Sequence, residues 1–134
     1  NTTIDIAQDE NGVVLQLRDN ILFESGKADL IDGSSEILDK INTLISTLPN
    51  SIVIEGHTDN VPISTSVYKD NWDLSTARAS NVLRYFTQLK GQDPTRFSAA
   101  GYGEYKPKVD NSTDENRAQN RRVNVLIVSN NEEW

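Results

Sequence analysis

The sequence lacks cysteine and methionine altogether, and it contains a single histidine, His57. Without cysteine the chain can form neither disulfides nor a thiol-based catalytic centre. A zinc site needs three or four nitrogen, sulfur or carboxylate ligands, and one histidine without any cysteine leaves that set incomplete. We therefore expect no metal site and no cofactor.

Long apolar runs are also absent. The sequence has no stretch of about 18 or more apolar residues, which a membrane-spanning helix would require, and it shows no signal-peptide pattern. Its 134 residues are enough for one domain with a hydrophobic core. We expect a single domain over residues 1–134, in which residues 1–19 form a lead-in with a hairpin and residues 130–134 form a polar tail.

Positive charge is scarce, because 13 lysines and arginines face 20 aspartates and glutamates, for a net charge of −7. Binding to nucleic acid depends on basic patches that displace counterions from phosphate, so we expect no nucleic-acid partner. A ligand with negative charge would need a focused pocket that acts against the field of the whole molecule.

The sequence predicts five strands, two of them in a hairpin. Alternating apolar residues on both sides of Asn11-Gly12 predict an N-terminal hairpin. Apolar, β-branched or glycine-bounded runs at residues 51–55, 97–102 and 122–128 predict three further strands.

Apolar residues at three- and four-residue steps predict two long helices. The first is capped by Asp32 or Ser34 and ends before Pro49. The second spans about residues 73–90, is capped by Asp73 or Ser75, and ends at Gly91. Its inward-facing residues are expected to be Leu74, Ala79, Val82, Leu83, Phe86 and Leu89. A short helix at 114–120, capped by Thr113 or Asp114, completes a pattern typical of helices packed on one mixed sheet.

The stretch from Gly56 to Arg78 holds the most informative polar residues. Asp59 follows a predicted strand, Arg78 lies in the first turns of a predicted helix, and a polar loop at 60–71 joins them. The pair suits a small ligand that carries both charges, because a carboxylate accepts from an ammonium and a guanidinium binds a carboxylate bidentately. A helix start near Arg78 would add its positive dipole end.

Structural interpretations of the same residues stay open. Asp59 can cap the turn after its strand, and Arg78 can be an ordinary solvated helix residue. One of the two arginines at 121–122 can form an ion pair with Asp59 or Glu55.

Catalytic interpretations have less support. His57 and Asp59 could belong to a nucleophilic triad, but the sequence has no Gly-x-Ser-x-Gly turn. Glu55, Asp59 and Glu104 could supply paired carboxylates for a cell-wall hydrolase, yet nothing fixes their spacing. A buried, hydrogen-bonded His57 at the strand end fits better, and we expect no enzyme.

Four ordered blocks resemble one known family. They are GHTD at 56–59, NWDLS at 71–75 followed by Arg78-Ala79, GYGE at 101–104 followed by Pro107, and NRRV at 120–123. Together they resemble the OmpA-like peptidoglycan-binding domain over about residues 20–128. The NVPI run at 60–63 and the long loop are closer to the B subunits of flagellar motor stators (MotB, MotS, PomB) than to porins or Pal lipoproteins.

The resemblance implies an α+β fold, a β/α sandwich with a mixed sheet of about four strands, helices on one face, and the N-terminal hairpin. It implies a non-catalytic domain outside the cytoplasmic membrane that anchors an ion-driven stator to the cell wall. The expected partners are peptidoglycan, a second copy in a homodimer, and the stator A subunit. The last contact would involve a single N-terminal membrane helix upstream of Asn1. An outer-membrane or lipoprotein anchor is the alternative within the family.

The resemblance also assigns a ligand and its contacts. The ligand is diaminopimelate in the peptide stem of peptidoglycan, with Asp59 for its ammonium and Arg78 for its carboxylate. Further contacts fall on Thr58, Asn71, Leu74 and Arg121. We expect the loop at 60–70 to be the variable part and to regulate anchoring.

Overall fold

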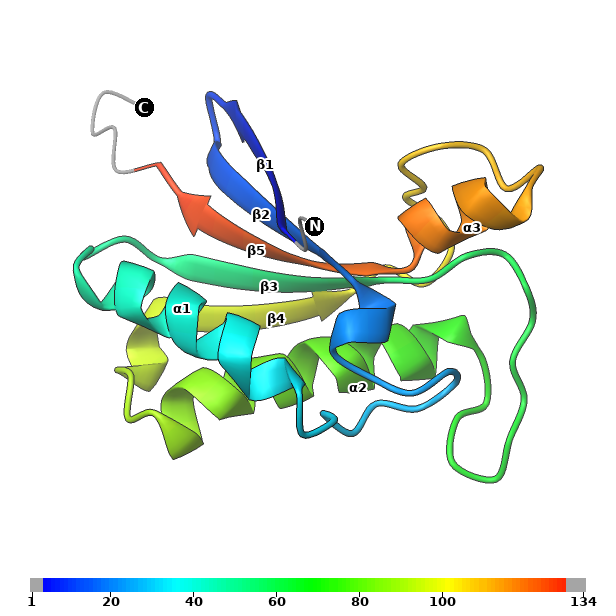
Figure 1. Cartoon of the computed structure of the whole chain (residues 1–134), viewed down its shortest axis with the longest axis horizontal. Helices are drawn as coiled ribbons and strands as arrows, with labels where there is room; N and C mark the ends of the chain where they lie inside the picture. The colour runs from blue at the N-terminus through cyan, green and yellow to red at the C-terminus, as the bar shows by residue number, and fades with distance from the viewer. Residues whose placement is uncertain (1–3, 130–134) are drawn as a thin grey trace.

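The strands form one mixed, five-stranded sheet in the computed structural model, which describes residues 4–129 (Figure 1). Its order is β1-β2-β5-β3-β4, and neighbouring strands are antiparallel except for the parallel pair β3 and β4. The bounds are β1 Ile4–Asp9, β2 Gly12–Arg18, β3 Ile52–His57, β4 Phe97–Gly101 and β5 Arg122–Val128. The predicted α+β class and mixed sheet are confirmed, while the predicted tail at 130–134 lies outside the described residues.

The N-terminal hairpin is part of this sheet, which therefore has five strands and not about four. Strand β2 pairs with β5 along its whole length, from Gly12 opposite Val128 to Arg18 opposite Arg122. Gly12 adopts a φ of +141°, and a Cβ atom there would lie 2.0 Å from the Ile127 carbonyl oxygen. Only glycine permits this close approach of the turn to β5.

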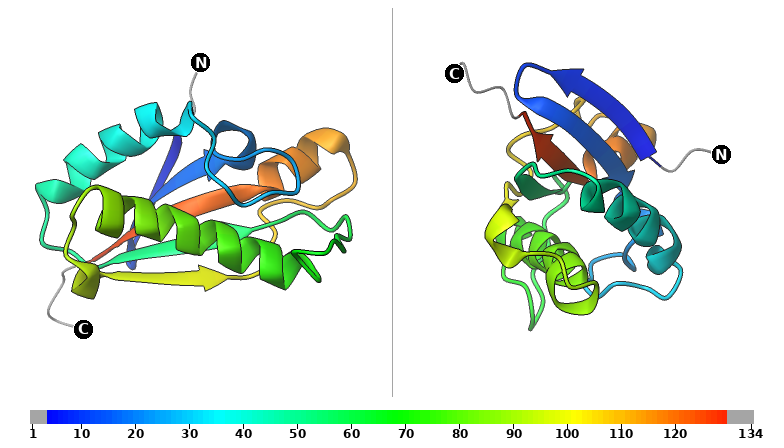
Figure 2. Two further views of the ribbon diagram at one scale, coloured as in Figure 1. Left: turned by 90° about the horizontal axis from the view of Figure 1, so that it is seen from below. Right: turned by 90° about the vertical axis from the view of Figure 1, so that its left-hand side faces the viewer.

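Two long helices cover one face of the sheet (Figures 1 and 2). They are α1 (Ser34–Ser46) and α2 (Asn71–Arg84), and α2 continues into the π-helical turn η2 (Tyr85–Leu89). The core between helices and sheet includes Leu15, Leu17, Leu38, Ile41, Ile45, Ile52, Ile54, Ala79, Val82, Phe86, Val123 and Val125. Burial of this apolar surface is the main favourable contribution to folding.

The predicted caps of both long helices are wrong. Helix α1 begins after Gly33, which forms no side-chain cap, and the Ser34 hydroxyl donates to the Ile31 carbonyl instead. Helix α2 begins earlier than predicted, and the Asp70 carboxylate accepts from the Asp73 N–H at 3.0 Å. The sequence offers several aspartates here, and the one that precedes the first helical residue acts as cap.

Leu89 was predicted to face the core but is 68% exposed. The cause is η2, where the Lys90 N–H donates to the Tyr85 carbonyl five residues earlier, which rotates the end of the helix away from its α-helical phase. Gly91 follows with a φ of +76° and ends the helix as predicted.

The remaining elements gather at the ends of the sheet. Helix α3 (Asp114–Asn120) is capped by Thr113, as one predicted alternative stated. The 3-10 turn η1 (Asp19–Ile21) follows β2, and η3 (Pro94–Arg96) precedes β4. The carboxyl end of β3, the start of α2 and η1 meet at one end of the molecule (Figure 1).

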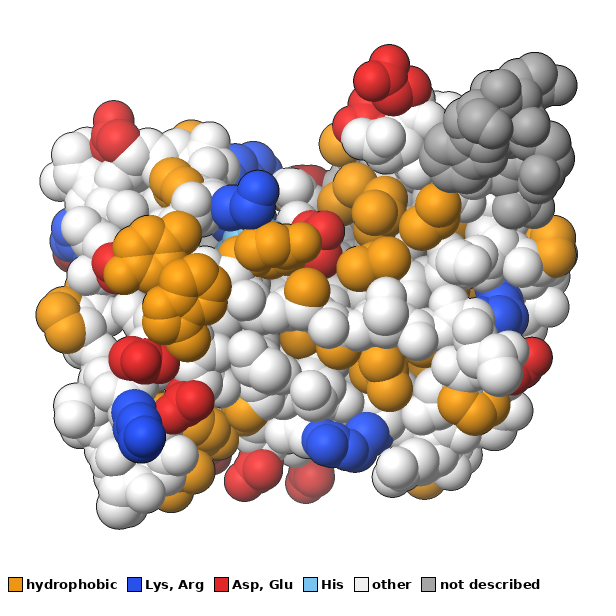
Figure 3. Space-filling view, turned by 180° about the vertical axis from the view of Figure 1, so that it is seen from behind, with side chains coloured by type: hydrophobic (Ala, Val, Ile, Leu, Met, Phe, Trp, Pro, Cys, Tyr) orange, Lys and Arg blue, Asp and Glu red, His pale blue; other side chains and the backbone are white. Residues whose placement is uncertain are grey.

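The opposite face of the sheet is not covered by α1 or α2. Seen from behind, hydrophobic side chains lie on this side among charged side chains of both signs (Figure 3). Within residues 4–129, none of the helices has the length and apolar content that crossing a bilayer requires.

Candidate functional site

An open pocket of about 350 Å³ lies at the carboxyl end of β3. Its walls come from the residues after β3, the start and middle of α2, η1 with the loop that follows it, and the residue before β5. The structure brings all six predicted binding residues to this pocket, namely Thr58, Asp59, Asn71, Leu74, Arg78 and Arg121. They come from three separate segments, so the fold and not the sequence spacing assembles them.

The close approach of α2 to β3 depends on Gly56. A Cβ atom at this position would lie 2.1 Å from the Ser75 carbonyl oxygen, so any larger residue would push the helix away. Glycine in the strand therefore sets the position of α2 beside Asp59.

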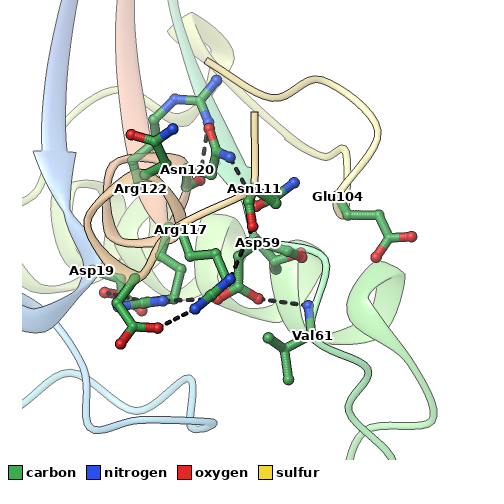
Figure 4. A network of polar contacts seen from close by, with 12 residues as sticks. Asp19, Asp59, Val61, Glu104, Asn111, Arg117, Asn120 and Arg122 are labelled. Carbon is green, nitrogen blue, oxygen red and sulfur yellow. Dashed lines mark hydrogen bonds and ion pairs between the residues drawn. The ribbon is translucent and has the colours of Figure 1, made fainter. Parts of the chain in front are cut away.

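The Asp59 carboxylate makes two contacts (Figure 4). Its Oδ1 accepts from the Val61 N–H at 3.0 Å, and its Oδ2 accepts from Arg121 Nη1 at 2.7 Å. The first contact is the turn-capping bond and the second is the ion pair that we predicted as structural alternatives for these residues. Both contacts fix the carboxylate in the pocket, where Asp59 is 8% exposed.

Arg78 is buried, with only 3% of its surface exposed, so the interpretation of a solvated helix residue is wrong. Its Nη1 donates to Asp19 Oδ2 at 2.9 Å, Nε donates to the Lys27 carbonyl at 2.7 Å, and Nη2 donates to the Glu24 carbonyl at 3.2 Å. The guanidinium lies over the Phe23 ring, 4.6 Å from its centroid. Arg78 thus ties α2 to the segment that forms one wall of the pocket.

The prediction that the positive end of a helix dipole lies near Arg78 is also wrong. Helix α2 begins at Asn71, which places Arg78 about two turns into the helix. The dipole effect is confined to the terminal turn. Asn71 and Leu74, in the first turn, are the residues that bring the helix start to the pocket.

Asn71 and Thr58 hold the pocket walls together. The Asn71 side-chain amide donates to the Val61 carbonyl at 3.1 Å and to the Asp59 carbonyl at 3.4 Å, and it lies 3.5 Å from Glu104 Oε1. The Thr58 N–H donates to the Gly103 carbonyl, and its hydroxyl donates to the Asp59 carbonyl. These bonds fix the base of the 60–70 loop, most of which is exposed. Its regulatory role stays a prediction.

Asp19 is the charged residue of the pocket that the sequence reasoning missed. It lies on η1 and is 8% exposed. Its carboxylate contacts both Arg78 and Arg121: Oδ2 is 2.9 Å from Arg78 Nη1, and Oδ1 is 3.6 Å from Arg121 Nε. One signal was available. Arg78 lies four residues from both Leu74 and Val82 on the apolar face of α2, and a buried arginine favours a carboxylate partner.

His57, the last residue of β3, does not line the pocket. It is 4% exposed, and its ring stacks on Tyr102 with centroids 5.1 Å apart. Burial lowers the pKa of His57, although the neighbouring Glu55 acts in the opposite direction. The imidazole Nε2 is 3.5 Å from Glu55 Oε1, which is too long for a well-formed hydrogen bond. The predicted burial is confirmed, but the predicted hydrogen bond is at best a weak contact.

Residues 22–121 match the OmpA family. Relatives in *Bacillus subtilis* include the uncharacterized protein YtxE, 46% identical over 120 residues, and motility protein B, 43% identical over 118 residues. These alignments cover 90% and 87% of this chain but 50% and 45% of the two relatives. The chain therefore spans about half the length of the curated relatives it matches.

Solved structures agree with this assignment. A putative MotB-like protein from *Desulfovibrio vulgaris* is 38% identical with a TM-score of 0.88, and the alignment covers 95% of this chain and 82% of that one. The periplasmic domain of *Helicobacter pylori* MotB is 26% identical with a TM-score of 0.86, covering 96% and 89%. The cell wall anchor of the type VI secretion system of *Pseudomonas aeruginosa* is 31% identical with a TM-score of 0.89, covering 95% and 88%.

This chain belongs to the OmpA family, and within it to the type represented by motility protein B. The resemblance inferred from the four sequence blocks is thereby confirmed. Domains of this class bind without catalysing a reaction, so the chain is a binding module and not an enzyme.

Proposed function

We propose that this domain binds peptidoglycan through the diaminopimelate of its peptide stem and thereby anchors a flagellar motor stator to the cell wall. The family and the relatives named motility protein B support this proposal. The domain then works outside the cytoplasmic membrane. In the longer protein a single N-terminal helix would hold it to that membrane, beside a second copy and the stator A subunit.

The observation that carries the proposal is the balanced charge of the pocket. Two carboxylates, Asp19 and Asp59, and two guanidinium groups, Arg78 and Arg121, line it together. The free end of diaminopimelate has an ammonium and a carboxylate on one carbon, so it is neutral overall and polar at both ends. A neutral pocket with groups of both signs complements it without an unpaired buried charge.

Both principal groups retain hydrogen-bonding capacity for such a ligand. A carboxylate can accept more bonds than the two that Asp59 receives from Val61 and Arg121. A guanidinium has more N–H groups than the three that Arg78 uses, which leaves donors on its two terminal nitrogens. The ammonium would share Asp59 with Arg121, and the carboxylate would bind the remaining N–H groups of Arg78.

An outer-membrane anchor is the second candidate. Outer membrane protein Omp38 of *Acinetobacter baumannii* is 35% identical over 115 residues, less than motility protein B of *Bacillus subtilis*. The same pocket would then bind the same ligand, and the two candidates differ in the protein that is anchored.

A sedimentation assay with insoluble peptidoglycan sacculi tests the proposal. Asp59→Asn should weaken binding at least about 30-fold, because it removes one partner of a charge-paired contact. The matched control is Asp32→Asn, which removes the same charge from an exposed position. Equal sedimentation of wild type and Asp59→Asn would sink the assignment. Soluble muropeptides released during incubation would instead indicate a hydrolase.

A further inference from the structure

Asp19 is held in place more firmly than an ordinary surface carboxylate. Its N–H donates to the Arg121 carbonyl at 2.9 Å, and its own carbonyl accepts from the N–H groups of Leu22 and Phe23 at 3.0 and 2.8 Å. The side chain is 11% exposed and lies at the pocket wall. The backbone bonds together with the contacts of the carboxylate to Arg78 and Arg121 hold the side chain at the pocket.

The Asp19 carboxylate binds the arginine that we assign to the ligand carboxylate. It accepts from Arg78 Nη1 at 2.9 Å and lies 3.6 Å from Arg121 Nε (Figure 4). It therefore occupies one donor of Arg78 and offsets one of the two positive charges. Without it, Asp59 alone would face Arg78 and Arg121, and the pocket would carry a net positive charge.

We propose that Asp19 determines the charge selectivity of the pocket, so that it accepts a zwitterionic amino-acid end in preference to an end that carries only a carboxylate. This inference rests on the proposed function, since it concerns the ligand of the same pocket. Asp19 lies before residue 22, where the match to the OmpA family begins. It is a positioning and selectivity residue of this chain that the four sequence blocks do not include.

Three synthetic stem peptides test the proposal by calorimetric titration of the 134-residue chain. One carries the free zwitterionic end of diaminopimelate, one is acetylated on that ammonium, and one is amidated on that carboxylate. Wild type should prefer the zwitterion. Asp19→Asn, which keeps the acceptor oxygen for Arg78, should shift the affinity ratio toward the acetylated, anionic peptide by about tenfold, as expected for one unit charge at short range.

A double variant controls for structural damage. Asp19→Asn combined with Arg121→Gln removes one charge of each sign and restores a neutral pocket. The ratio of zwitterion to acetylated-peptide affinity should therefore return toward that of wild type, although both affinities fall because Arg121 also holds Asp59. Asp32→Asn lowers the same negative charge of the protein away from the pocket and should leave the ratio unchanged. A purely structural role of Asp19 would weaken all three peptides by the same factor.

The outcomes separate the two proposals. If Asp59→Asn abolishes zwitterion binding while Asp19→Asn leaves the ratio of affinities unchanged, the role of Asp19 is overturned and the binding function stands. If wild type binds none of the peptides, or if Asp59→Asn binds them as well as wild type does, both proposals are overturned.

Discussion

The pocket and a second polar cluster, formed by residues of β3 and β5, use the same residue types for different purposes. We call the second group the rear cluster, and it consists of Glu55, His57, Arg122 and Asn124. The two regions are adjacent along the chain. His57, at the end of β3, belongs to the rear cluster, and Asp59, two residues later, belongs to the pocket. Arg121 reaches Asp59, whereas the next residue, Arg122, donates to the carbonyls of Asn120 and Lys106 on the other side.

The two neighbouring arginines differ in access to the outside. Arg121 has 37% of its side chain exposed at the pocket, whereas Arg122 is 7% exposed. Among the described residues, both His57 nitrogens, Arg122 Nε and Asn124 Oδ1 are buried without a hydrogen-bond partner. None of the rear-cluster residues lines the pocket. Polar residues therefore make a binding site only where spare donors and acceptors face a cavity.

The largest expected effect is on the free energy of unfolding, and it concerns the two buried arginines, Arg78 in the pocket and Arg122 in the rear cluster. Arg78→Ala and Arg122→Ala should each lower the free energy of unfolding by about 3 kcal/mol, because Arg78→Ala leaves Asp19 without its ion-pair partner and Arg122→Ala leaves two carbonyls without their charged donor. Urea unfolding at pH 7 measures this loss. Only Arg78→Ala should also abolish peptide binding under conditions where the protein is still folded. Loss of binding in folded Arg122→Ala would remove the distinction between the regions.

The next prediction compares the carboxylate of Asp59, which follows β3, with that of Glu55, which lies within β3. Asp59→Asn should weaken binding of the zwitterionic stem peptide by about 2 kcal/mol or more, while Glu55→Gln should leave it unchanged. Glu55 accepts from Asn124 at 3.2 Å and lies outside the pocket, so its charge has no direct contact with the ligand. Calorimetric titration measures both affinities, and equal losses would contradict the assignment of the ligand to Asp59.

The third prediction concerns pH and the rear cluster alone. Burial lowers the pKa of His57 below its ordinary value of 6.5. The unfolded chain therefore takes up a proton near pH 6.5 that the folded protein does not, so stability present above that pH falls as the solution is acidified. His57→Asn should flatten the fall in unfolding free energy between pH 7 and about pH 5. An unchanged slope in urea titrations would show that the imidazole is accessible to solvent.

The smallest effect concerns Lys27, which directly follows Gly26 of the pocket lining. Its carbonyl binds Arg78, but its ammonium forms only a surface ion pair with Glu24 at 3.3 Å, with both side chains mostly exposed. Lys27→Ala should change stability by less than about 0.5 kcal/mol, since exposed pairs contribute little. Thermal unfolding checks this, and a larger loss would mean that the side chain and not the carbonyl supports Arg78.

The sequence was sufficient for the elements whose signals are local. The periodicity of α1 and α2, the hairpin at Asn11-Gly12 and the five strand runs all appear in the structure. Local signals failed where neighbours compete, as at the cap of α2, where Asp70 acts in place of Asp73. They also failed at Leu89, because periodicity assumes an α-helix and the chain forms a π turn there.

The site was predictable only in part. The six predicted pocket residues belong to blocks that resemble a known family, and the structure brings them together. Asp19 belongs to no such block, and only the tertiary fold brings it to Arg78 across the long separation between β2 and α2. Whether a polar residue faces the pocket or the rear cluster depends on where β3 ends and β5 begins, since Asp59 and Arg121 lie just outside these strands while His57 and Arg122 lie within them.

The most direct test of this account is a titration of the isotopically labelled chain with the zwitterionic stem peptide, followed by amide chemical shifts. The largest shifts should fall on Thr58, Asn71 and Leu74 at the pocket, while the rear-cluster amides of Glu55 and Asn124 should change little. In Asp59→Asn the same shifts should need at least about 30-fold more peptide. Shifts centred on the rear cluster, or equal shifts in wild type and Asp59→Asn, would contradict the account.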